Sequence, residues 1–498
     1  MKRINIIFII FLFSVLGCTD LTEELYDKIP GDLYPENELQ VATLSVPAYA
    51  AMRPLADDEG WWFLAQEMTS DEVCGPTRDA DWDDGGKWRV MHTHTWNNDV
   101  EGVNHMWGRL YEAVTTCNKI ADELRALPQS EQIDKKIAEL EVLRSFYYYL
   151  LMDNFGDVPY LETTIDVPEK PFKNKREDIW NELVTTVETN LPQLQNIDKK
   201  YLATRPMAFA LLAKLYLNAE VYVGQAHYDK AGIYCDSIIN SGFYTMDSDP
   251  LGPFVTENEN NPEIIFSIPY DEDNFKGFRF HMRTLHYQSN LTFDMPVGPW
   301  NGFAVLEDHY DSYEDGDLRK EGYFLAGQQY TSDGKEIIDA IAKEKLLFTK
   351  HIPALRMDAS FTPAEIRMSG VRMVKYEVAK GAIENLSNDF VLFRLADIYL
   401  MKAETEIRLN GAGAGDEWID PIRERANVLP IDGAGLDEIL AERGREMFCE
   451  GHRRQDLIRF GKFDDAWWEK PSSDPSREIF PIPKWATDAN ENLLLDPQ

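Results

Sequence analysis

The sequence predicts a mostly α-helical protein, in which TPR-like helix pairs form a scaffold interrupted by a long, loop-rich and partly β insert. Three observations support this prediction. Between about residues 104 and 242, apolar residues recur at steps of three and four, as they do on one face of a helix. From about 243 to 388, Pro, Gly and aromatic residues crowd together without long helical stripes. Helical spacing then returns from about 389 to 452.

The scaffold prediction rests on a series of apolar stripes with helical spacing, at residues 107–124, 137–155, 179–191, 209–223 and 228–240. Asn174 and Glu177 precede the third stripe at the spacing of a capping box, and Gly242 follows the fifth as a C-terminal glycine. The fourth stripe is apolar on two faces, so its helix needs neighbours on both sides. Such units in succession predict a TPR-like stack, although no regular repeat length is present.

The insert and the return to helix complete the expected domain. Residues 263–268 lie between two prolines and predict a short strand. Helices are expected again at 393–407 and 436–451. Because loops on a rigid scaffold usually carry binding, we expect the insert at about 243–388 to hold the ligand-binding part of one domain, residues 37–498.

The charge of the chain excludes one class of partner. Its 498 residues contain 50 Lys and Arg against 86 Asp and Glu, which gives a formal net charge of −36. Nucleic-acid binding needs a basic surface that neutralises phosphates, so nucleic acid is not an expected partner. A neutral ligand such as an uncharged sugar is not repelled.

The N-terminus has the features of a bacterial lipoprotein signal. Two basic residues precede an apolar run at residues 4–16, which is shorter than the roughly 20 residues that cross a bilayer. The run ends in a glycine followed by Cys18, as in a lipobox. We expect residues 1–17 to be removed, Cys18 to carry acyl chains that anchor it in the outer membrane, and residues 18–36 to form a polar tether. Acidic residues soon after Cys18 resemble the signal for the cell surface. The alternative is an ordinary secretory signal with an incidental cysteine.

The other cysteines do not predict a disulfide framework or a zinc site. Cys74, Cys117, Cys235 and Cys449 are widely spaced, and none belongs to a C-x-x-C motif. We therefore expect free buried thiols, with pairing as the alternative.

Two aromatic stretches, 61–98 and 287–301, have the composition of a sugar-binding platform. Sugars stack their apolar C–H faces on aromatic rings, while their hydroxyls need charged or amide partners. The candidate ligand-binding residues are Trp61, Trp62, Arg78, Asp81, Trp82, Trp96, Tyr287, Trp300 and Asn301. The alternative is that these rings plug the loops onto the helical core.

Two short motifs could hold a metal. Asp79-x-Asp81-x-Asp83 invites a calcium site, but an EF-hand loop would need glycine and glutamate where Asp84 and Val90 stand. His92-x-His94 lacks a third ligand, so solvent-exposed or structural histidines are expected instead. We expect no metal and no cofactor, with Ca²⁺ in another geometry as the open alternative.

The sequence also lacks signs of an enzyme. No G-x-S-x-G, Walker or H-E-x-x-H motif is present. The charged residues between 442 and 459 resemble a catalytic cluster, but we interpret them as a salt-bridge network that locks the last helix. Pairs of acids for glycoside hydrolysis are uninformative without geometry in so acidic a chain.

Six blocks, in order along the chain, resemble the SusD/RagB family. They are LEVLRSFYYYLLMDNFGDVP at 140–159, RPMAFALLAKLYL at 205–217, NPEIIF at 261–266, FRLADIYLMKAE at 393–404, ERGREMFCEGHRRQDLIRFG at 442–461 and FPIP at 480–483. Family chains commonly end in a QNPGY-like tail, whereas this one ends LLLDPQ, which puts only the last contacts in doubt.

The resemblance implies a function as well as a fold. It implies TPR-like helix pairs, no catalytic activity, and capture of a glycan at the cell surface for a TonB-dependent, SusC-like transporter. Three alternatives stay open: RagB-like peptide binding, a surface glycosidase, and a TPR-like adaptor that binds only protein.

Overall fold

The computed structural model describes residues 38–57 and 59–497, which fall into two compact units. The first unit ends at Leu44 and contributes helix α2 (Glu38–Leu44), while the second, from Ser45, holds all the other described elements. The signal expected at 1–17, the acylation expected at Cys18 and the tether expected at 18–36 lie outside the described residues. No helix of the described chain is both long enough and apolar enough to span a membrane.

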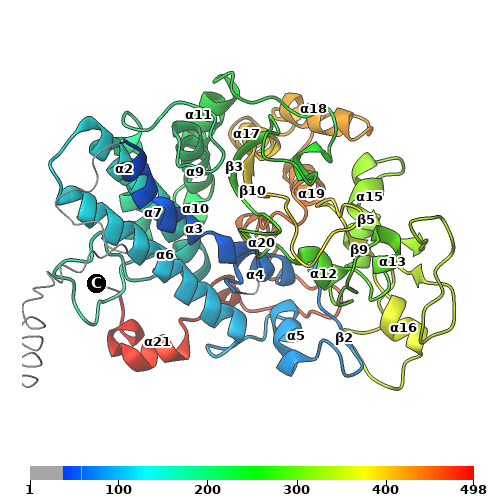
Figure 1. Ribbon diagram of the computed structural model, residues 1–498. Helices are drawn as coiled ribbons and strands as arrows, with labels where there is room; N and C mark the ends of the chain where they lie inside the picture. Colours follow the sequence, from blue (N-terminus) through cyan, green and yellow to red (C-terminus); the bar gives the residue numbers. More distant parts are fainter. Residues whose placement is uncertain (1–37, 58, 498) are drawn as a thin grey trace, which may run out of the picture. The chain divides into compact units, whose positions relative to one another are not determined.

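The scaffold of the second unit begins with long helices packed in succession. They are α6 (Glu101–Arg125), α7 (Glu131–Phe155), α8 (Arg176–Asn190), α9 (Arg205–Leu217) and α11 (Tyr228–Ile239). Helix α6 packs against α7, α7 against α8, α8 against α9, and α9 against α11 (Figure 1). Each lies over one of the predicted stripes, and the mostly helical prediction is confirmed.

Two of the long helices begin with a side-chain cap, and a third lacks the cap that the sequence predicted for it. Ser130 and Thr204 cap α7 and α9 by accepting a hydrogen bond from a backbone N–H of the first turn. Helix α8 has no side-chain cap. The Asn174 Oδ1 instead accepts from the backbone N–H of Tyr160 at 2.9 Å. The predicted capping box at Asn174 and Glu177 is therefore wrong, because Asn174 ties two loop segments together.

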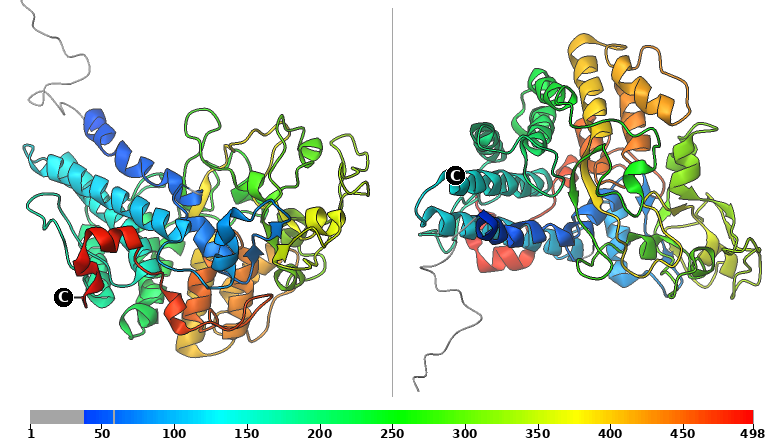
Figure 2. Two further views of the ribbon diagram at one scale, coloured as in Figure 1. Left: turned by 90° about the horizontal axis from the view of Figure 1, so that it is seen from below. Right: turned by 45° about the horizontal axis from the view of Figure 1, so that its top comes forward.

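A second group of helices continues the stack. It contains α17 (Leu395–Asn410), α18 (Asp416–Arg425), α19 (Leu436–Glu446) and α20 (Arg453–Arg459). Helix α11 packs against α17, which in turn contacts α18 and α19, and the views of Figure 2 agree with this order. Residues from the two halves of the sequence thus form one helical scaffold.

One buried strand pair lies beside these helices. Strand β3 (Ile264–Ile268) pairs antiparallel with β10 (Phe390–Arg394), and every residue of both is buried. The predicted strand at 263–268 is confirmed and starts one residue later. The helix expected from Phe393 begins at Leu395, because Phe393 and Arg394 still pair with β3.

The remaining elements are short. Four further strand pairs join β1 (Val73–Cys74) to β4 (Ala304–Val305), β2 (Thr77–Arg78) to β8 (Arg356–Met357), β5 (Phe324–Leu325) to β9 (Arg372–Met373), and β6 (Gly327–Gln328) to β7 (Leu347–Phe348). Short helices are α3 (Val46–Ala50), α4 (Trp62–Met68), α5 (Lys87–His92), α10 (Ala219–Val223), α12 (Phe280–Thr284), α13 (Asn290–Phe293), α14 (Glu307–Asp311), α15 (Leu318–Tyr323), α16 (Pro363–Met368) and α21 (Lys484–Ala489). The pairs β1–β4 and β2–β8 attach the first aromatic stretch to the insert.

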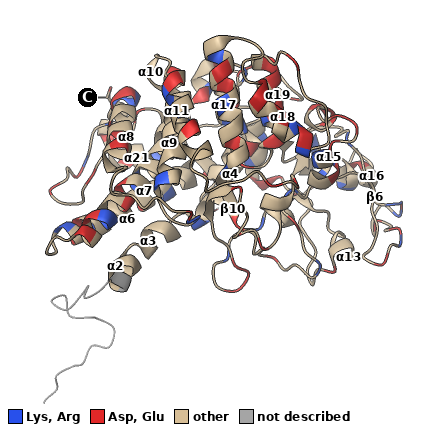
Figure 3. Cartoon of the chain, turned by 90° about the horizontal axis from the view of Figure 1, so that it is seen from above, with Lys and Arg blue, Asp and Glu red and all other residues tan. Residues whose placement is uncertain are grey.

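The charged series at 442–459 forms a buried ion network, as predicted. Arg394 pairs with Glu263, Glu446 and Glu450 at 2.7 Å each. The same region contains pairs of Arg319 with Glu442 and Glu446, of Arg443 with Asp397 and Asp456, and of Arg459 with Glu404 and Asp456. Figure 3 shows acidic and basic residues gathered around α17, α18 and α19. The network therefore fastens α19 and α20 to α17 and to the buried strands.

The neighbouring arginines keep the carboxylates of this network ionised. Burial alone would raise the pKa of Glu442, but the guanidinium groups of Arg319 and Arg445 outweigh it and lower that pKa to about 2. The pKa of Glu446 also lies far below its ordinary value, for the same reason. These carboxylates stay charged at neutral pH and serve as scaffold.

The four cysteines of the described chain are free and buried, as expected from their spacing. They are Cys74, Cys117, Cys235 and Cys449. Burial raises the pKa of the Cys74 thiol and of the Cys117 thiol to about 12, so both stay protonated. These side chains therefore act as small apolar groups in the core.

Candidate functional site

The two aromatic stretches of the sequence meet at one surface. The indole Nε1 of Trp82 donates to the carbonyl oxygen of Trp300 at 2.7 Å, and the Tyr287 hydroxyl donates to the Asp81 carboxylate. Asp81 is exposed, while Tyr287 and Trp300 are half-buried. Together with Arg367, these residues form what we call the Tyr287 surface. Four of the nine predicted ligand-binding residues thus lie together, although they come from distant parts of the chain.

The backbone around this surface is shaped to bring the rings close. Asp81 closes a tight turn in which its backbone and that of Arg78 exchange hydrogen bonds. Trp82 and Asn301 both have a left-handed backbone, with φ of 58° and 59°. A Cβ at Gly302 would lie 2.3 Å from the Trp82 ring, so only glycine allows the ring to pack there.

Arg367 was not predicted from the sequence. It lies on α16, and its guanidinium carbon is 4.6 Å from the centre of the Tyr287 ring. Its Nε donates to both carboxylate oxygens of the buried Asp339 at 3.0 Å. Burial would raise the pKa of Asp339, but hydrogen bonds from His286 and Arg367 hold it well below its ordinary value. The sequence signals only the helix that carries it, through the capping box from Thr362 to Glu365 that starts α16.

Trp300 also carries cationic neighbours. The guanidinium carbons of Arg283 and Arg279 lie 5.3 and 6.0 Å from the centre of its ring. Both arginines pair with Asp57, at 2.8 and 2.7 Å, which fixes them in place. Each half-buried ring of the Tyr287 surface therefore has a guanidinium on one side and keeps part of its area open to solvent.

A cluster of buried aromatic rings packs against Trp82. Trp61 stacks on Trp88 with centroids 4.7 Å apart and an angle of 19° between the planes. Trp88 lies 5.8 Å from Trp82, and Phe303 contacts both Trp82 and Trp88 edge-on. This packing gives Trp82 a fixed orientation, and with 8% of its area exposed the ring is buried and supports the Tyr287 surface from inside the protein.

Three other predicted tryptophans do not reach the surface. Trp61 and Trp96 are 0% and 1% exposed, and Trp62 is 6% exposed. Trp96 packs against Phe480 at 4.8 Å, and Trp62 against Phe390 at 6.4 Å. The expectation that these rings contact a ligand does not fit this placement, because neighbouring side chains cover them. Their packing is that of the core, which the sequence left as the alternative.

Arg78 and Asn301 are also buried, and they support α16. The Arg78 guanidinium donates to the carbonyl oxygens of Ile366 at 2.7 Å and Ser369 at 3.1 Å. Asn301 Nδ2 donates to the carbonyl oxygen of Arg367 at 3.1 Å. Burial lowers the pKa of Arg78 to about 10, so it is still charged at neutral pH. Both side chains position Arg367 and have no exposed area for a ligand.

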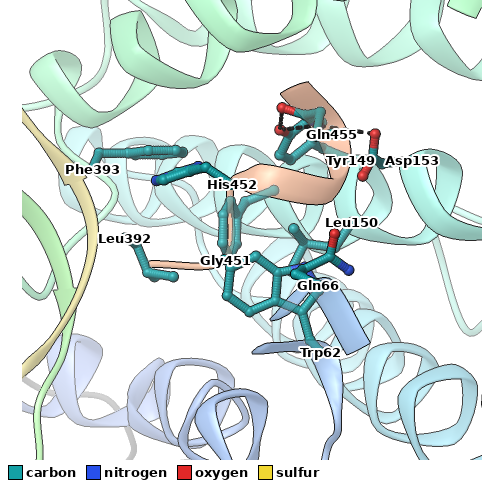
Figure 4. A pocket seen from close by; sticks show the side chains of 11 residues that line it. Trp62, Gln66, Tyr149, Leu150, Asp153, Leu392, Phe393, Gly451, His452 and Gln455 are labelled. Carbon is teal, nitrogen blue, oxygen red and sulfur yellow. Dashed lines mark hydrogen bonds between the residues drawn. The ribbon is translucent and has the colours of Figure 1, made fainter. Parts of the chain in front are cut away.

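An internal cavity lies where α4, α7 and α20 meet. Its volume is about 20 Å³, and its lining is Trp62, Gln66, Phe146, Tyr149, Leu150, Asp153, Leu392, Phe393, Gly451, His452 and Gln455 (Figure 4). Hydrogen bonds join Gln455 to Tyr149 and Asp153 on its polar side. The space suits about one water molecule and is far too small for a sugar.

A much larger pocket opens between β7 and α16. Its volume is about 650 Å³, within the roughly 300–1,000 Å³ of small-molecule sites. The lining residues are Gln328, Glu344, Lys345, Leu347, Thr349, His351, Pro353, Ala364, Glu365, Met368 and Ser369. All of them belong to the insert, and none was singled out from the sequence.

The acidic motif at 79–83 and the histidine motif at 92–94 make contacts within the protein. Asp81 binds Tyr287, whereas Asp83 pairs with Arg89 at 2.8 Å, so their carboxylates serve different partners. His92 and His94 are buried and bond to backbone carbonyls, and burial lowers their pKa values. Across residues 38–57 and 59–497, no group of three or more His, Cys, Asp or Glu is placed to hold a metal ion.

Two family models match the chain. The model described as the SusD family matches residues 358–478, which include Arg367. The model described as starch-binding associating with outer membrane matches residues 68–217, which include Asp81 and Trp82. Asp81, Trp82 and Arg367 therefore lie in matched regions, whereas Tyr287 and Trp300 lie between them.

Curated relatives align over most of the chain. The starch-binding protein SusD of Bacteroides thetaiotaomicron is 26% identical over 441 residues, which cover 80% of this chain and 77% of that protein. SusD-like protein P25 of Formosa agariphila is 23% identical, and the alignment covers 99% of this chain and 98% of that protein.

Solved structures share the fold. A laminarin-binding SusD-like protein superposes with a TM-score of 0.72 at 21% identity, over 91% of this chain and 98% of that chain. Surface glycan-binding protein A from Bacteroides thetaiotaomicron, in complex with laminarihexaose, gives a TM-score of 0.71 at 21% identity, over 90% and 97% of the two chains. With both family models matched and relatives aligned across most of its length, the chain belongs to the SusD/RagB family.

Proposed function

We propose that the protein binds a neutral oligosaccharide on the Tyr287 surface and does not cleave it. The observation that carries this proposal is the meeting of two partly open rings, Tyr287 and Trp300, with the exposed carboxylate of Asp81 and the guanidinium of Arg367. The rings offer apolar faces for sugar C–H groups, while Asp81 and Arg367 offer an acceptor and donors for hydroxyls.

The relatives support a carbohydrate ligand. One is named a starch-binding protein, one solved structure is a laminarin-binding protein, and another holds laminarihexaose. These ligands are uncharged glucans, which agrees with a chain of net charge −36 that would repel an anionic polymer.

The site also supports binding without catalysis. Glycoside hydrolysis generally uses a pair of carboxyl groups on either side of the scissile bond. The Tyr287 surface has one, Asp81, and its carboxylate already accepts a hydrogen bond from Tyr287. The relatives are named as binding proteins.

Two further parts of the proposal rest on the sequence and the family. We place the protein on the outer membrane through acyl chains on Cys18, and we propose that it delivers its ligand to a SusC-like, TonB-dependent transporter. A Cys18→Ala variant should lose labelled palmitate and membrane retention. Affinity purification of the tagged protein from its own cells should recover the transporter.

Calorimetry with defined ligands tests the binding proposal. We expect maltohexaose or laminarihexaose to bind the mature protein, with Tyr287→Ala and Trp300→Ala each lowering affinity by about tenfold or more. Trp485→Ala removes an exposed ring, 52% accessible, on the C-terminal helix α21 and should leave affinity unchanged. Micromolar binding of peptides without sugar binding would favour the peptide alternative, and release of reducing ends would favour a glycosidase.

A further inference from the structure

We propose that the pocket beside α16 is a second subsite, which takes a side branch or further units of the same neutral oligosaccharide. This inference rests on the proposed function of the Tyr287 surface. The pocket has a volume of about 650 Å³, and its walls come from the hairpin β6–β7, the turn after β7, and α16.

Helix α16 is the wall shared by the two subsites. Ala364, Glu365 and Met368 line the pocket. Arg367, on the same helix, extends to the Tyr287 ring and to Asp339 instead. A helix with its side chains is about 10–12 Å across. An oligosaccharide of a few units is therefore long enough to lie on the Tyr287 surface and reach over α16 into the pocket.

Buried side chains hold this wall rigidly. The backbone carbonyl of Ser369 accepts from Arg78 at 3.1 Å and from Arg372 at 2.9 Å. Arg372 also bonds the Asn301 side chain at 2.8 Å, and Asn301 holds the carbonyl of Arg367. Because charged donors make strong hydrogen bonds, this buried cluster fixes the C-terminal end of α16, which carries both Arg367 and Met368. The pocket is thus built before a ligand arrives, and it shares its support with the Tyr287 surface.

The chemistry of the lining fits an uncharged, hydroxyl-rich ligand. Leu347, Pro353, Ala364 and Met368 supply apolar area, and the other lining residues supply hydrogen-bonding groups. Lys345 is already paired with Glu336 at 2.6 Å, so it offers no unmatched positive charge for an anionic sugar. The lining contains no Phe, Tyr or Trp, so a sugar there would be enclosed by the walls, whereas rings would stack under it on the Tyr287 surface.

Blocking the pocket tests the inference. Thr349 is exposed and lines the pocket, so Thr349→Trp should fill it without touching the Tyr287 surface. Leu347→Trp, on β7, fills the same space from a second position. The matched control is Lys335→Trp, which adds the same side chain in the exposed turn 331–335 between β6 and β7, where Lys335 does not line the pocket. Circular dichroism and the melting temperature establish that each variant is folded.

The probes are two ladders, laminaribiose to laminarihexaose and maltose to maltohexaose, with laminarin as a branched ligand, measured by calorimetry. We expect both pocket variants to weaken hexasaccharide or laminarin binding by about tenfold, and to leave disaccharide and trisaccharide binding within about twofold. Lys335→Trp should match the wild type throughout.

The outcomes separate this inference from the proposed function. Wild-type hexasaccharide and laminarin binding in Thr349→Trp and Leu347→Trp, with loss in Tyr287→Ala, overturns the second subsite and leaves the proposed function intact. Absence of sugar binding in the wild type overturns both. Loss of peptide binding alone in the pocket variants overturns the assignment of a sugar to this pocket.

Discussion

Tyr287 combines two contributions that substitution can separate. Its ring has a guanidinium on one side, and its hydroxyl fixes the carboxylate of Asp81. Tyr287→Phe keeps the ring and removes the hydrogen bond. We expect sugar affinity to fall by about two- to tenfold, less than in Tyr287→Ala, because Asp81 loses its orientation while stacking persists.

The matching stability measurement checks that interpretation. Because the Tyr287–Asp81 bond lies in an exposed setting, Tyr287→Phe should change the free energy of unfolding by less than about 1 kcal/mol. A loss of stability much larger than this, with unchanged sugar affinity, would mean that the hydroxyl serves the fold and not the ligand.

Glu67 makes stability depend on pH. Burial raises its pKa from 4.5 to about 8, although the backbone N–H of Gly451 donates to it at 2.9 Å. Between those pH values the folded state holds a proton that the unfolded state has lost. The stability that this proton brings is complete below pH 4.5 and is lost as the pH rises to about 8.

Glu67→Gln should remove this dependence, because the amide has nearly the same shape and does not ionise. Relative to wild type, the variant should gain about 1.4 kcal/mol of unfolding free energy for each pH unit between pH 5 and 8. Urea unfolding at several pH values measures the difference. Glu123→Gln, on the exposed face of α6, is the control and should show no such trend. A constant difference across the range would contradict a protonated Glu67.

At the scale of elements, α16 depends on Arg78, a buried donor that lies 288 residues before its acceptor Ile366. Arg78→Ala leaves the carbonyls of Ile366 and Ser369 without one of their donors. We expect a loss of about 1–3 kcal/mol in unfolding free energy, faster hydrogen exchange in α16, and weaker sugar binding. Arg356→Ala, an exposed arginine on the neighbouring strand β8, is the matched control. Unchanged exchange in α16 would show that Arg78 does not position it.

The elements also show what a single sequence can predict. The long helices and β3 followed from periodicity and proline boundaries, because each buries a regular stripe. The sequence predicted that the stretches containing Asp81 and Tyr287 bind a ligand, but it did not predict that these two residues contact each other. Arg367 and the pocket could not be predicted, because they depend on how a short helix packs against distant loops. The burial of Trp61 and Trp96 could not be predicted for the same reason, because the position of a ring in a loop does not show whether distant side chains will cover it.

At the scale of the second unit, the buried ion network holds sequence-distant elements together. Arg394→Met would leave three buried carboxylates, those of Glu263, Glu446 and Glu450, short of a partner. We expect a loss of about 3–5 kcal/mol in the free energy of unfolding. Lys484→Met, which breaks an exposed pair with Asp488, should cost less than about 1 kcal/mol. Equal effects of the two changes in chemical denaturation would contradict a structural role for the network.

At the scale of the whole molecule, the proposed function requires the scaffold to keep the side chains of the Tyr287 surface in fixed positions. The buried rings against Trp82, the arginines beside Trp300 and the donors to the carbonyls of α16 hold the Tyr287 surface in place. A site fixed in this way loses little conformational freedom when a ligand binds. It follows that sugar binding should involve side-chain adjustments of Tyr287 and Arg367 and leave the helices where they are.

A crystal structure of the mature protein with laminarihexaose or maltohexaose, whichever binds more tightly, tests the central claim most directly. The account predicts a sugar ring against Tyr287 or Trp300, with a hydroxyl within hydrogen-bonding distance of Asp81 or Arg367. Sugar bound elsewhere, with the Tyr287 surface empty and its affinity insensitive to Tyr287→Ala, would contradict it.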